Sequence, residues 1–275
     1  MAITTGMQYI NPASLPHNWC SGCGHGIVLG AIARAFEELD YDPSRVVVVS
    51  GIGCWGKVDD YMSTNALHTL HGRALTYATG LKAANPELQV VALMGDGDGA
   101  TIGGNHLIHA ARRNMDITGI LVNNYNYGMT GGQNSATTPV GSFTSTTVYG
   151  NPESAFDICS LVAAAGANYV ARETVAGGAR LKSRIKEALS CEGFGFVEAI
   201  GPCTTLFGPK NNMKRPVEMI HWLKEKGVSP AKVETIEDAA GHGYFTVGKL
   251  AERSKPGFIA MYSQVRERAM SSKEK

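Results

Sequence analysis

Four cysteines lie close to glycine or proline residues that favour turns, and four thiolates placed there could bind a metal. Cys20 and Cys23 form a Cys-x-x-Cys pair, Cys54 follows Gly-Ile-Gly, and Cys203 follows Gly-Pro. Four thiolates bind either zinc or a four-iron, four-sulfur cluster, and spacing alone does not decide between them. A Cys-x-x-Cys pair can also be a redox pair, although that chemistry favours a preceding strand and none is predicted here.

A second set of polar residues follows two predicted strands. Gly-Asp-Gly-Asp-Gly (95–99) comes after a strand predicted at 89–94, and Asn-Asn-Tyr-Asn-Tyr-Gly (123–128) after one at 117–122. In a parallel sheet, ligands bind beyond the carboxyl ends of the strands. Asp96 and the asparagines there offer the hard oxygen ligands that Mg²⁺ uses when it also binds phosphates. An isolated Gly-Asp-Gly is more often an ordinary turn, but the asparagine pair favours a cation site.

A parallel sheet is needed to bring these motifs together. Strands are predicted at 46–50, 89–94, 117–122, 168–171 and 195–200. Helices are predicted at 26–39, 74–84, 105–114, 153–165, 175–190 and 217–226. This alternation predicts an α/β fold, with a mostly parallel sheet covered by helices on both faces. We expect one domain over residues 1–207. Residues 208–275, which begin with a basic run at 210–215, are expected to pack on it as a C-terminal extension.

Composition argues against several classes of protein. The 275 residues carry a formal net charge of +1, which indicates no nucleic-acid partner. No apolar run is long enough to predict a membrane span. Residues 1–16 lack the basic and apolar segments of a secretory signal, so we expect a cytoplasmic protein with reduced thiols. The remaining cysteines, Cys159 and Cys191, are predicted to be buried thiols.

The order of the motifs resembles the β subunit of 2-oxoacid:ferredoxin oxidoreductases across almost the whole chain. The Cys-x-Gly-Cys-Gly run is followed by Gly-Ile-Gly-Cys, His-Gly-Arg with Ala-Thr-Gly, Gly-Asp-Gly-Asp, the asparagine motif and a late Pro-Cys-Thr. The resemblance implies the diphosphate-binding module of a thiamine-diphosphate enzyme. The implied reaction is thiamine- and coenzyme A-dependent oxidative decarboxylation of a 2-oxoacid to acyl-CoA and carbon dioxide. Electrons would pass through a 4Fe-4S cluster to ferredoxin, and the reaction could also run in reverse.

The resemblance also implies roles for individual residues. The cluster ligands would be Cys20, Cys23, Cys54 and Cys203, with iron rather than zinc. The Mg²⁺ ligands would be Asp96, the side chain of Asn124 and the backbone oxygen of Asn126. Further cofactor-binding residues would be His25, Cys54, Gly97, Asp98, Tyr127, Gly128 and Thr130. The catalytic residues would be Lys57, His71 and Arg73, with Lys57 binding the substrate carboxylate.

Each of these roles has a plainer alternative. His25 could serve merely as a cap of the following helix. Residues 71–73 could be an ordinary turn, and Lys57 could be a solvated surface lysine. Some family members carry lysine where this chain has Gly131, so the oxoacid stays open. We expect 2-oxoglutarate, with pyruvate or branched-chain 2-oxoacids as alternatives.

The motifs account for only one of the two modules of a thiamine enzyme. The resemblance therefore implies a separate α subunit that supplies the pyrimidine-side module and its glutamate, in an α2β2 assembly. Ferredoxin, the 2-oxoacid and coenzyme A would be the other partners. Two alternatives remain at this stage. A non-redox thiamine-diphosphate decarboxylase subunit would not need the four cysteines, and a zinc-stabilised binding protein would not need the Mg²⁺ ligands.

Overall fold

A seven-stranded sheet in the order β2-β1-β3-β4-β6-β5-β9 forms the centre of the computed structural model, which describes residues 5–239 and 241–272. The strands are β1 (Val46–Ser50), β2 (Asn65–His68), β3 (Gln89–Gly95), β4 (Thr118–Asn123), β5 (Tyr169–Thr174), β6 (Gly195–Ile200) and β9 (Gly248–Glu252). Every neighbouring pair is parallel except β5 and β9. The predicted α/β class with a mostly parallel sheet is therefore confirmed.

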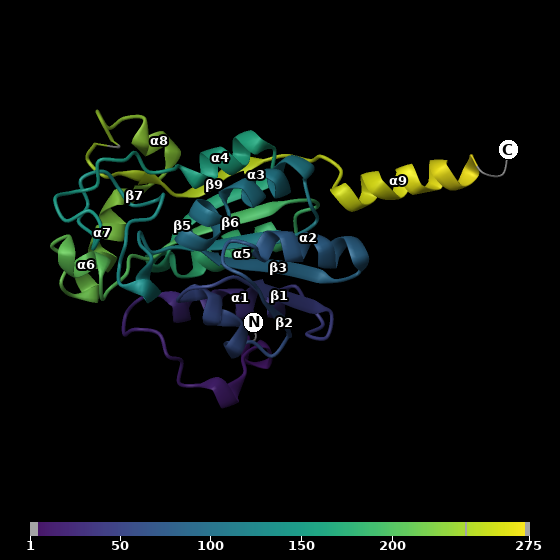
Figure 1. Cartoon of the computed structure of the whole chain (residues 1–275), viewed down its shortest axis with the longest axis horizontal. Helices are drawn as coiled ribbons and strands as arrows, with labels where there is room; N and C mark the ends of the chain where they lie inside the picture. Colours follow the sequence, from purple (N-terminus) through teal and green to yellow (C-terminus); the bar gives the residue numbers. More distant parts are fainter. Residues whose placement is uncertain (1–4, 240, 273–275) are drawn as a thin grey trace.

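Helices cover both faces of this sheet (Figure 1). One face carries α1 (His25–Glu38) and α5 (Ala179–Leu189), and the other carries α2 (Ala74–Ala84), α3 (Gly104–Arg113) and α4 (Ile158–Ala165). Because successive side chains of a strand point to opposite faces, β1 divides its valines between the two cores. Val46 and Val48 pack with α1, whereas Val47 and Val49 pack with α2.

The chain after residue 207 adds a strand to the main sheet. Its elements are α6 (Phe207–Lys210), α7 (Pro216–Lys226), β7 (Gly227–Val228), α8 (Pro230–Val233), β8 (Phe245–Thr246), β9 and α9 (Phe258–Ser271). β9 pairs antiparallel with β5, and α9 then leads away from the body of the molecule (Figure 1). The division at residue 207 stays a prediction, and its outer ends, 1–4 and 273–275, lie outside the described residues. Within the described ranges, no helix combines the length and apolar character needed to cross a membrane.

Several predicted boundaries were wrong for local reasons. The helix predicted at 153–165 begins only at Ile158, because Asp157 caps it by accepting a hydrogen bond from the Ser160 N–H at 3.2 Å. The helix predicted at 175–190 is interrupted at Gly178, whose φ of +55° is left-handed, and α5 begins after it. The turn predicted at 95–99 is helical, since Gly97–Ile102 form a π-helical segment leading into α3. Such segments are frequent at functional sites.

Candidate active site

The two sets of predicted residues meet beyond the carboxyl ends of β1, β3 and β4. A cavity of about 200 Å³ lies there, lined by residues 52–55, 71, 95–98, 124 and 126–130. The chain leaves β1 for β2 on one side and returns to β3 on the other, so the strand order reverses at this point. Such a switch point is where open parallel sheets bind ligands.

Three oxygen atoms converge at one end of this cavity. The side-chain oxygen of Asn124 lies 2.6 Å from the backbone oxygen of Asn126 and 3.0 Å from Oδ1 of Asp96. Three acceptors this close repel one another unless the Asn124 amide turns to present its NH₂ group or a cation lies among them. A carboxylate, an amide oxygen and a backbone carbonyl form a donor set suited to Mg²⁺. The residues therefore fit the predicted cation.

Asp96 is buried and held by two hydroxyls that sequence reasoning missed. Its Oδ2 accepts hydrogen bonds from Ser135 Oγ at 2.5 Å and Thr137 Oγ1 at 2.8 Å. Burial raises the pKa of Asp96 to about 6, although these hydrogen bonds oppose the increase. The available signal was the hydroxyl-rich run at 135–138, which follows the asparagine motif in an irregular loop.

The Gly-Asp-Gly-Asp-Gly segment (95–99) and the loop that carries the asparagine motif (123–128) pack closely against each other. A Cβ atom at Gly97 would lie 2.3 Å from the Tyr127 ring, so only glycine fits beneath that ring. The backbone N–H of Gly128 donates to the Asn126 carbonyl at 3.0 Å, which turns the loop back on itself. Thr130 also lines the cavity, and its hydroxyl donates to Gln133 at 2.7 Å.

Asp98 fastens the neighbouring loops to this turn. Its Oδ1 accepts hydrogen bonds from the Gly72 N–H at 2.6 Å and the Ile52 N–H at 3.3 Å. His71 lines the cavity, and its Nδ1 lies 3.0 Å from the same oxygen. Burial raises the pKa of Asp98, while these contacts oppose the change. Asp98 thus joins the loops that follow β1 and β2 to the carboxyl end of β3.

Hydrogen bonds link the three segments of the chain that carry Cys20, Cys23, Cys54 and Cys203. The Trp19 indole N–H donates to the Cys54 carbonyl at 2.6 Å, and the Cys203 N–H donates to the Asn124 carbonyl at 3.1 Å. The Thr204 hydroxyl donates to the Ser21 carbonyl at 3.3 Å. The loops of Cys54 and Cys203 are therefore both bonded to the Cys-x-x-Cys segment, and the Cys203 loop is also bonded to the asparagine loop.

The thiols lie close enough to influence one another electrostatically. The pKa of Cys54 is raised to about 11, first by burial and then by negative charge on the other three thiols. A Cβ atom at Gly128 would lie 3.5 Å from Cys54 Sγ, so this thiol borders the cofactor cavity. Cys20 is exposed, whereas Cys23 is buried. Among the described residues, no three His, Cys, Asp or Glu side chains converge as ligands of a single ion.

His25 lies beside one of these thiols and does not cap its helix. Its Nδ1 is 3.2 Å from Cys23 Sγ, and no side-chain capping bond is present at the start of α1. Burial lowers the pKa of His25 to about 4.

Two of the residues predicted to be catalytic lie outside the cavity lining. Nζ of Lys57 is 3.4 Å from Asp60 Oδ2, and its side chain is partly exposed. The Arg73 guanidinium donates to the Gly72 carbonyl at 3.1 Å. The roles of Lys57, His71 and Arg73 stay predictions.

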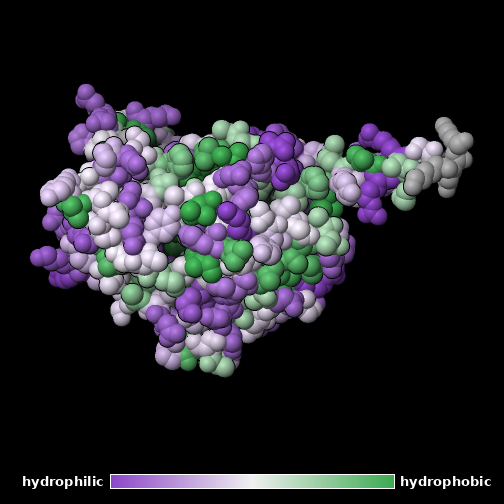
Figure 2. All heavy atoms as spheres, viewed as in Figure 1, coloured by the Kyte–Doolittle hydropathy of each residue, from purple (hydrophilic) through white to green (hydrophobic). Residues whose placement is uncertain are grey.

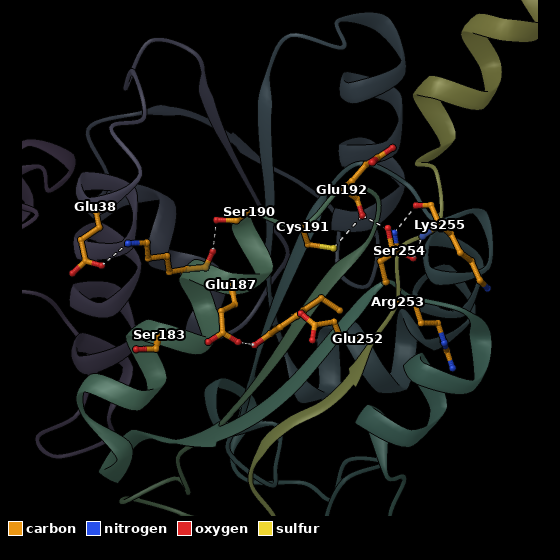
Figure 3. A pocket seen from close by; sticks show the side chains of 13 residues that line it. Glu38, Ser183, Glu187, Ser190, Cys191, Glu192, Glu252, Arg253, Ser254 and Lys255 are labelled. Atoms are coloured by element: carbon orange, nitrogen blue, oxygen red, sulfur yellow. Dashed lines mark hydrogen bonds and ion pairs between the residues drawn. The ribbon is translucent and has the colours of Figure 1, made fainter.

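The two other cysteines have different surroundings. Cys159 is fully buried, as predicted. Cys191 is only partly buried, which corrects the prediction, because it lies at the rim of a cavity of about 560 Å³ (Figure 3). That cavity lies at the opposite, amino-terminal edge of the parallel strands. Several of its charged groups are already engaged: Lys186 contacts Glu38 at 3.1 Å, and Tyr169 donates to Glu187 at 2.6 Å.

Comparison with known proteins finds relatives along most of the chain. Residues 51–199 match the model of the thiamine pyrophosphate enzyme C-terminal TPP-binding domain. The chain is 48% identical over 250 residues to 2-oxoglutarate synthase subunit KorB of Methanothermobacter thermautotrophicus, covering 91% of this chain and 87% of that one. It is 43% identical over 265 residues to the subunit of the same name from Methanocaldococcus jannaschii, covering 96% and 98%.

Two further matches are a less similar subunit and a solved structure. The 2-oxoacid:ferredoxin oxidoreductase subunit beta of Saccharolobus solfataricus is 42% identical over 191 residues, covering 69% of this chain and 63% of that one. Among solved structures, the 2-oxoglutarate:ferredoxin oxidoreductase from Magnetococcus marinus, with 2-oxoglutarate, coenzyme A and succinyl-CoA bound, is similar with a TM-score of 0.85. It is 32% identical, and the match covers 98% of this chain and 92% of that one.

Proposed function

Because this chain belongs to the β subunits of the 2-oxoacid:ferredoxin oxidoreductases, we propose that it binds Mg²⁺ and thiamine diphosphate for the coenzyme A-dependent oxidation of 2-oxoglutarate. The observation that carries this proposal is the convergence of oxygens from Asp96, Asn124 and Asn126 in a cavity bordered by Cys54. A cation site in a cavity that is lined by one of four proposed ligand cysteines suits a redox thiamine enzyme better than a zinc protein or a non-redox decarboxylase.

The residues around the cavity would bind and orient the cofactor. Asp96, the Asn124 side chain and the Asn126 carbonyl would hold the Mg²⁺, and through it the diphosphate. Close packing of Tyr127 on Gly97 keeps the two ligand-bearing loops in register. When bound, thiamine diphosphate supplies the electron sink that a 2-oxoacid needs to lose carbon dioxide.

The four cysteines would hold a 4Fe-4S cluster between this cavity and the surface. Cys54 borders the cavity, whereas Cys20 is the exposed thiol, so the thiol set reaches outward from the cofactor site. Ferredoxin is the proposed electron acceptor, and a reducing compartment such as the cytoplasm suits the thiols. An α2β2 assembly with a separate α subunit is part of the same proposal.

Metal analysis of anaerobically purified protein tests the redox proposal. We expect about four irons per chain with matching acid-labile sulfide. Replacement of Cys54 or Cys203 by serine should abolish the cluster, whereas Cys191→Ser, the control, should retain it. Zinc without labile sulfide would contradict the proposal.

The substrate is proposed from the relatives and from one lysine. The relatives at 43–48% identity are named 2-oxoglutarate synthase subunits, and Lys57 lies three positions beyond Cys54. When substrate binds, the Lys57 ammonium would leave Asp60 and pair with the substrate carboxylate. Removing a hydrogen bond between charged groups costs about 1.5–3 kcal/mol, so Lys57→Ala should raise KM for 2-oxoglutarate by ~10-fold or more.

Side-by-side assays of 2-oxoglutarate, pyruvate and branched-chain 2-oxoacids decide the substrate. Lys232→Ala, an exposed lysine on α8, is the control and should leave KM unchanged. A clear preference for pyruvate or a branched-chain oxoacid would refute the 2-oxoglutarate assignment.

A further inference from the structure

His25 contacts a cysteine that the proposed function assigns to the cluster, yet it is not a ligand in that proposal. The side chain is 2% exposed, and its Nδ1 lies 3.2 Å from Cys23 Sγ. Within the described part of the chain, its other nitrogen, Nε2, is buried and has no hydrogen-bond partner. Among the side chains of the described residues, the Cys23 sulfur is the one hydrogen-bond partner of this ring, and the backbone of Cys23 also contacts it.

Aromatic side chains fix the orientation of the imidazole. The His25 ring centroid lies 5.4 Å from that of Trp19 and 5.5 Å from that of Trp55, and the two indoles stack at 5.6 Å. Trp55 is fully buried, and Trp19 is anchored by its hydrogen bond to the Cys54 carbonyl. This packing keeps Nδ1 on the sulfur and excludes water from the same side of the thiol.

The chemistry of a metal-bound thiolate determines which nitrogen carries the proton. A metal-bound thiolate has no proton to donate, so the Cys23 sulfur can only accept a hydrogen bond. The close contact is favourable only if Nδ1 is the protonated nitrogen. The other tautomer would also bury an N–H at Nε2 without an acceptor, which is costly. Both considerations favour the Nδ1–H tautomer.

We propose that His25 donates a hydrogen bond from Nδ1 to the thiolate of Cys23 and thereby raises the reduction potential of the cluster. This rests on the proposed function, because it requires a cluster on the four cysteines. A hydrogen bond to a ligand sulfur draws electron density from it and stabilises the reduced, more negative form of the cluster. His25 thus acts as a positioning and tuning residue, and it contacts the cofactor's ligand rather than the substrate.

Variants of two neighbouring histidines separate hydrogen bonding from packing. His25→Phe keeps an aromatic ring but has no donor, whereas His25→Asn can place its amide N–H near the position of Nδ1. His17→Phe is the control, since His17 packs on Trp19 at 5.1 Å but is exposed and lies outside the Cys23 contact. Redox titration of the holoenzyme, followed by electron paramagnetic resonance, measures the cluster potential in each.

The expected order of potentials is specific. His25→Phe should lower the potential, His25→Asn should restore part of the difference, and His17→Phe should match the wild type. An unchanged potential in His25→Phe, or equal potentials in His25→Phe and His25→Asn, would overturn the inference. Wild-type protein without iron and sulfide would instead overturn the proposed function.

A second measurement applies even if His25→Phe fails to assemble its cluster. Wild-type protein labelled with ¹⁵N only in histidine should show a weak magnetic coupling between the reduced cluster and one histidine nitrogen. His25→Asn should lose this coupling, and His17→Phe should keep it. Absence of the coupling in the wild type, or its persistence in His25→Asn, would overturn the proposed hydrogen bond.

Discussion

At the residue scale, hydroxyl groups from a neighbouring loop hold the Asp96 carboxylate in place. Thr137 Oγ1 lies 2.8 Å from Asp96 Oδ2 and 3.0 Å from Asn123 Oδ1, so it connects two loops that lead to the cation site. Asn123 in turn donates to Glu198 at 2.8 Å, and Glu198 pairs with the buried Arg172 at 2.6 Å. Asp96, the predicted Mg²⁺ ligand, thus lies at the end of a buried network of hydrogen-bonded side chains.

Asp96→Ala should abolish retention of thiamine diphosphate, because it removes the one carboxylate proposed to hold Mg²⁺. Thr137→Val should weaken Mg²⁺-dependent cofactor binding by ~10-fold or more, since a hydrogen bond to a charged group contributes about 1.5–3 kcal/mol. Isothermal titration calorimetry measures both effects.

Thr144→Val is the matched control for Thr137→Val. Thr144 is a buried threonine of the same loop, and its hydroxyl bonds only to other residues of that loop. Its replacement should leave cofactor affinity unchanged. Wild-type affinity in Asp96→Ala would move the cation site elsewhere.

The sequence predicted the ligands of this site better than their supports. Asp96 and Asn124 follow strands, so strand position alone places them at one edge of the sheet. Ser135 and Thr137 lie in an irregular loop, and no periodic pattern shows that this loop folds back onto Asp96. Their role appears only in the three-dimensional structure.

At the element scale, α7 begins against the Cys-x-x-Cys loop. Gly22 has a φ of +77°, and a Cβ atom there would lie 2.6 Å from Pro216 Cβ. Lys210 and Lys214 precede this proline in the chain, and both are exposed, as is Cys20. A solvated surface explains these lysines, but a basic segment that leads into a helix packed on the Cys-x-x-Cys loop also suits docking of an acidic electron carrier.

Charge reversal distinguishes these two interpretations. Lys210→Glu with Lys214→Glu should raise KM for ferredoxin several-fold, most strongly at low salt, because surface attraction is screened by ions. Reduction of a small viologen dye should be unchanged. Lys249→Glu, on β9, is the control, and equal effects of both changes would indicate a solvated surface without a docking role.

The two main-sheet strands that the sequence analysis missed, β2 and β9, lie at the edges of the sheet and have weak strand patterns in the sequence. β2 reads Asn-Ala-Leu-His, mostly exposed at the sheet edge, and contains no β-branched residue. β9 is likewise an edge strand, paired to the sheet on one side only. The buried strands β1, β3, β4 and β6 were predicted closely, because parallel strands covered on both faces are almost continuously apolar.

At the scale of the whole molecule, the rim of the cofactor cavity is apolar and exposed. Met129 and Ile52 line the cavity yet are 51% and 38% exposed, and nearby Leu70 and Ile102 are 66% and 47% exposed. Figure 2 shows further apolar side chains on the face over α2 and α3. Exposed apolar side chains gathered around a candidate active site favour a partner that covers them.

The partner should be a different polypeptide rather than a second copy of this chain. A thiamine enzyme needs one module for the diphosphate and another whose glutamate contacts the aminopyrimidine. The sheet described above supplies the first, and the chain beyond residue 207 adds short helices, one strand of that sheet and α9. A second module needs on the order of 100 residues with a core of its own. The described residues beyond 207 do not form one, so a symmetric copy of them could not supply it.

The chain alone should therefore bind its cluster but show no oxoacid-dependent reduction of a viologen dye. Co-expression with an α subunit should restore turnover, and it should protect the apolar rim around Met129 and Ile52 from hydrogen exchange. Met129→Glu should weaken this assembly, because it places a charge in the covered surface, whereas Met261→Glu on the remote helix α9 serves as the control. Full turnover by the isolated chain would contradict the requirement for a second polypeptide.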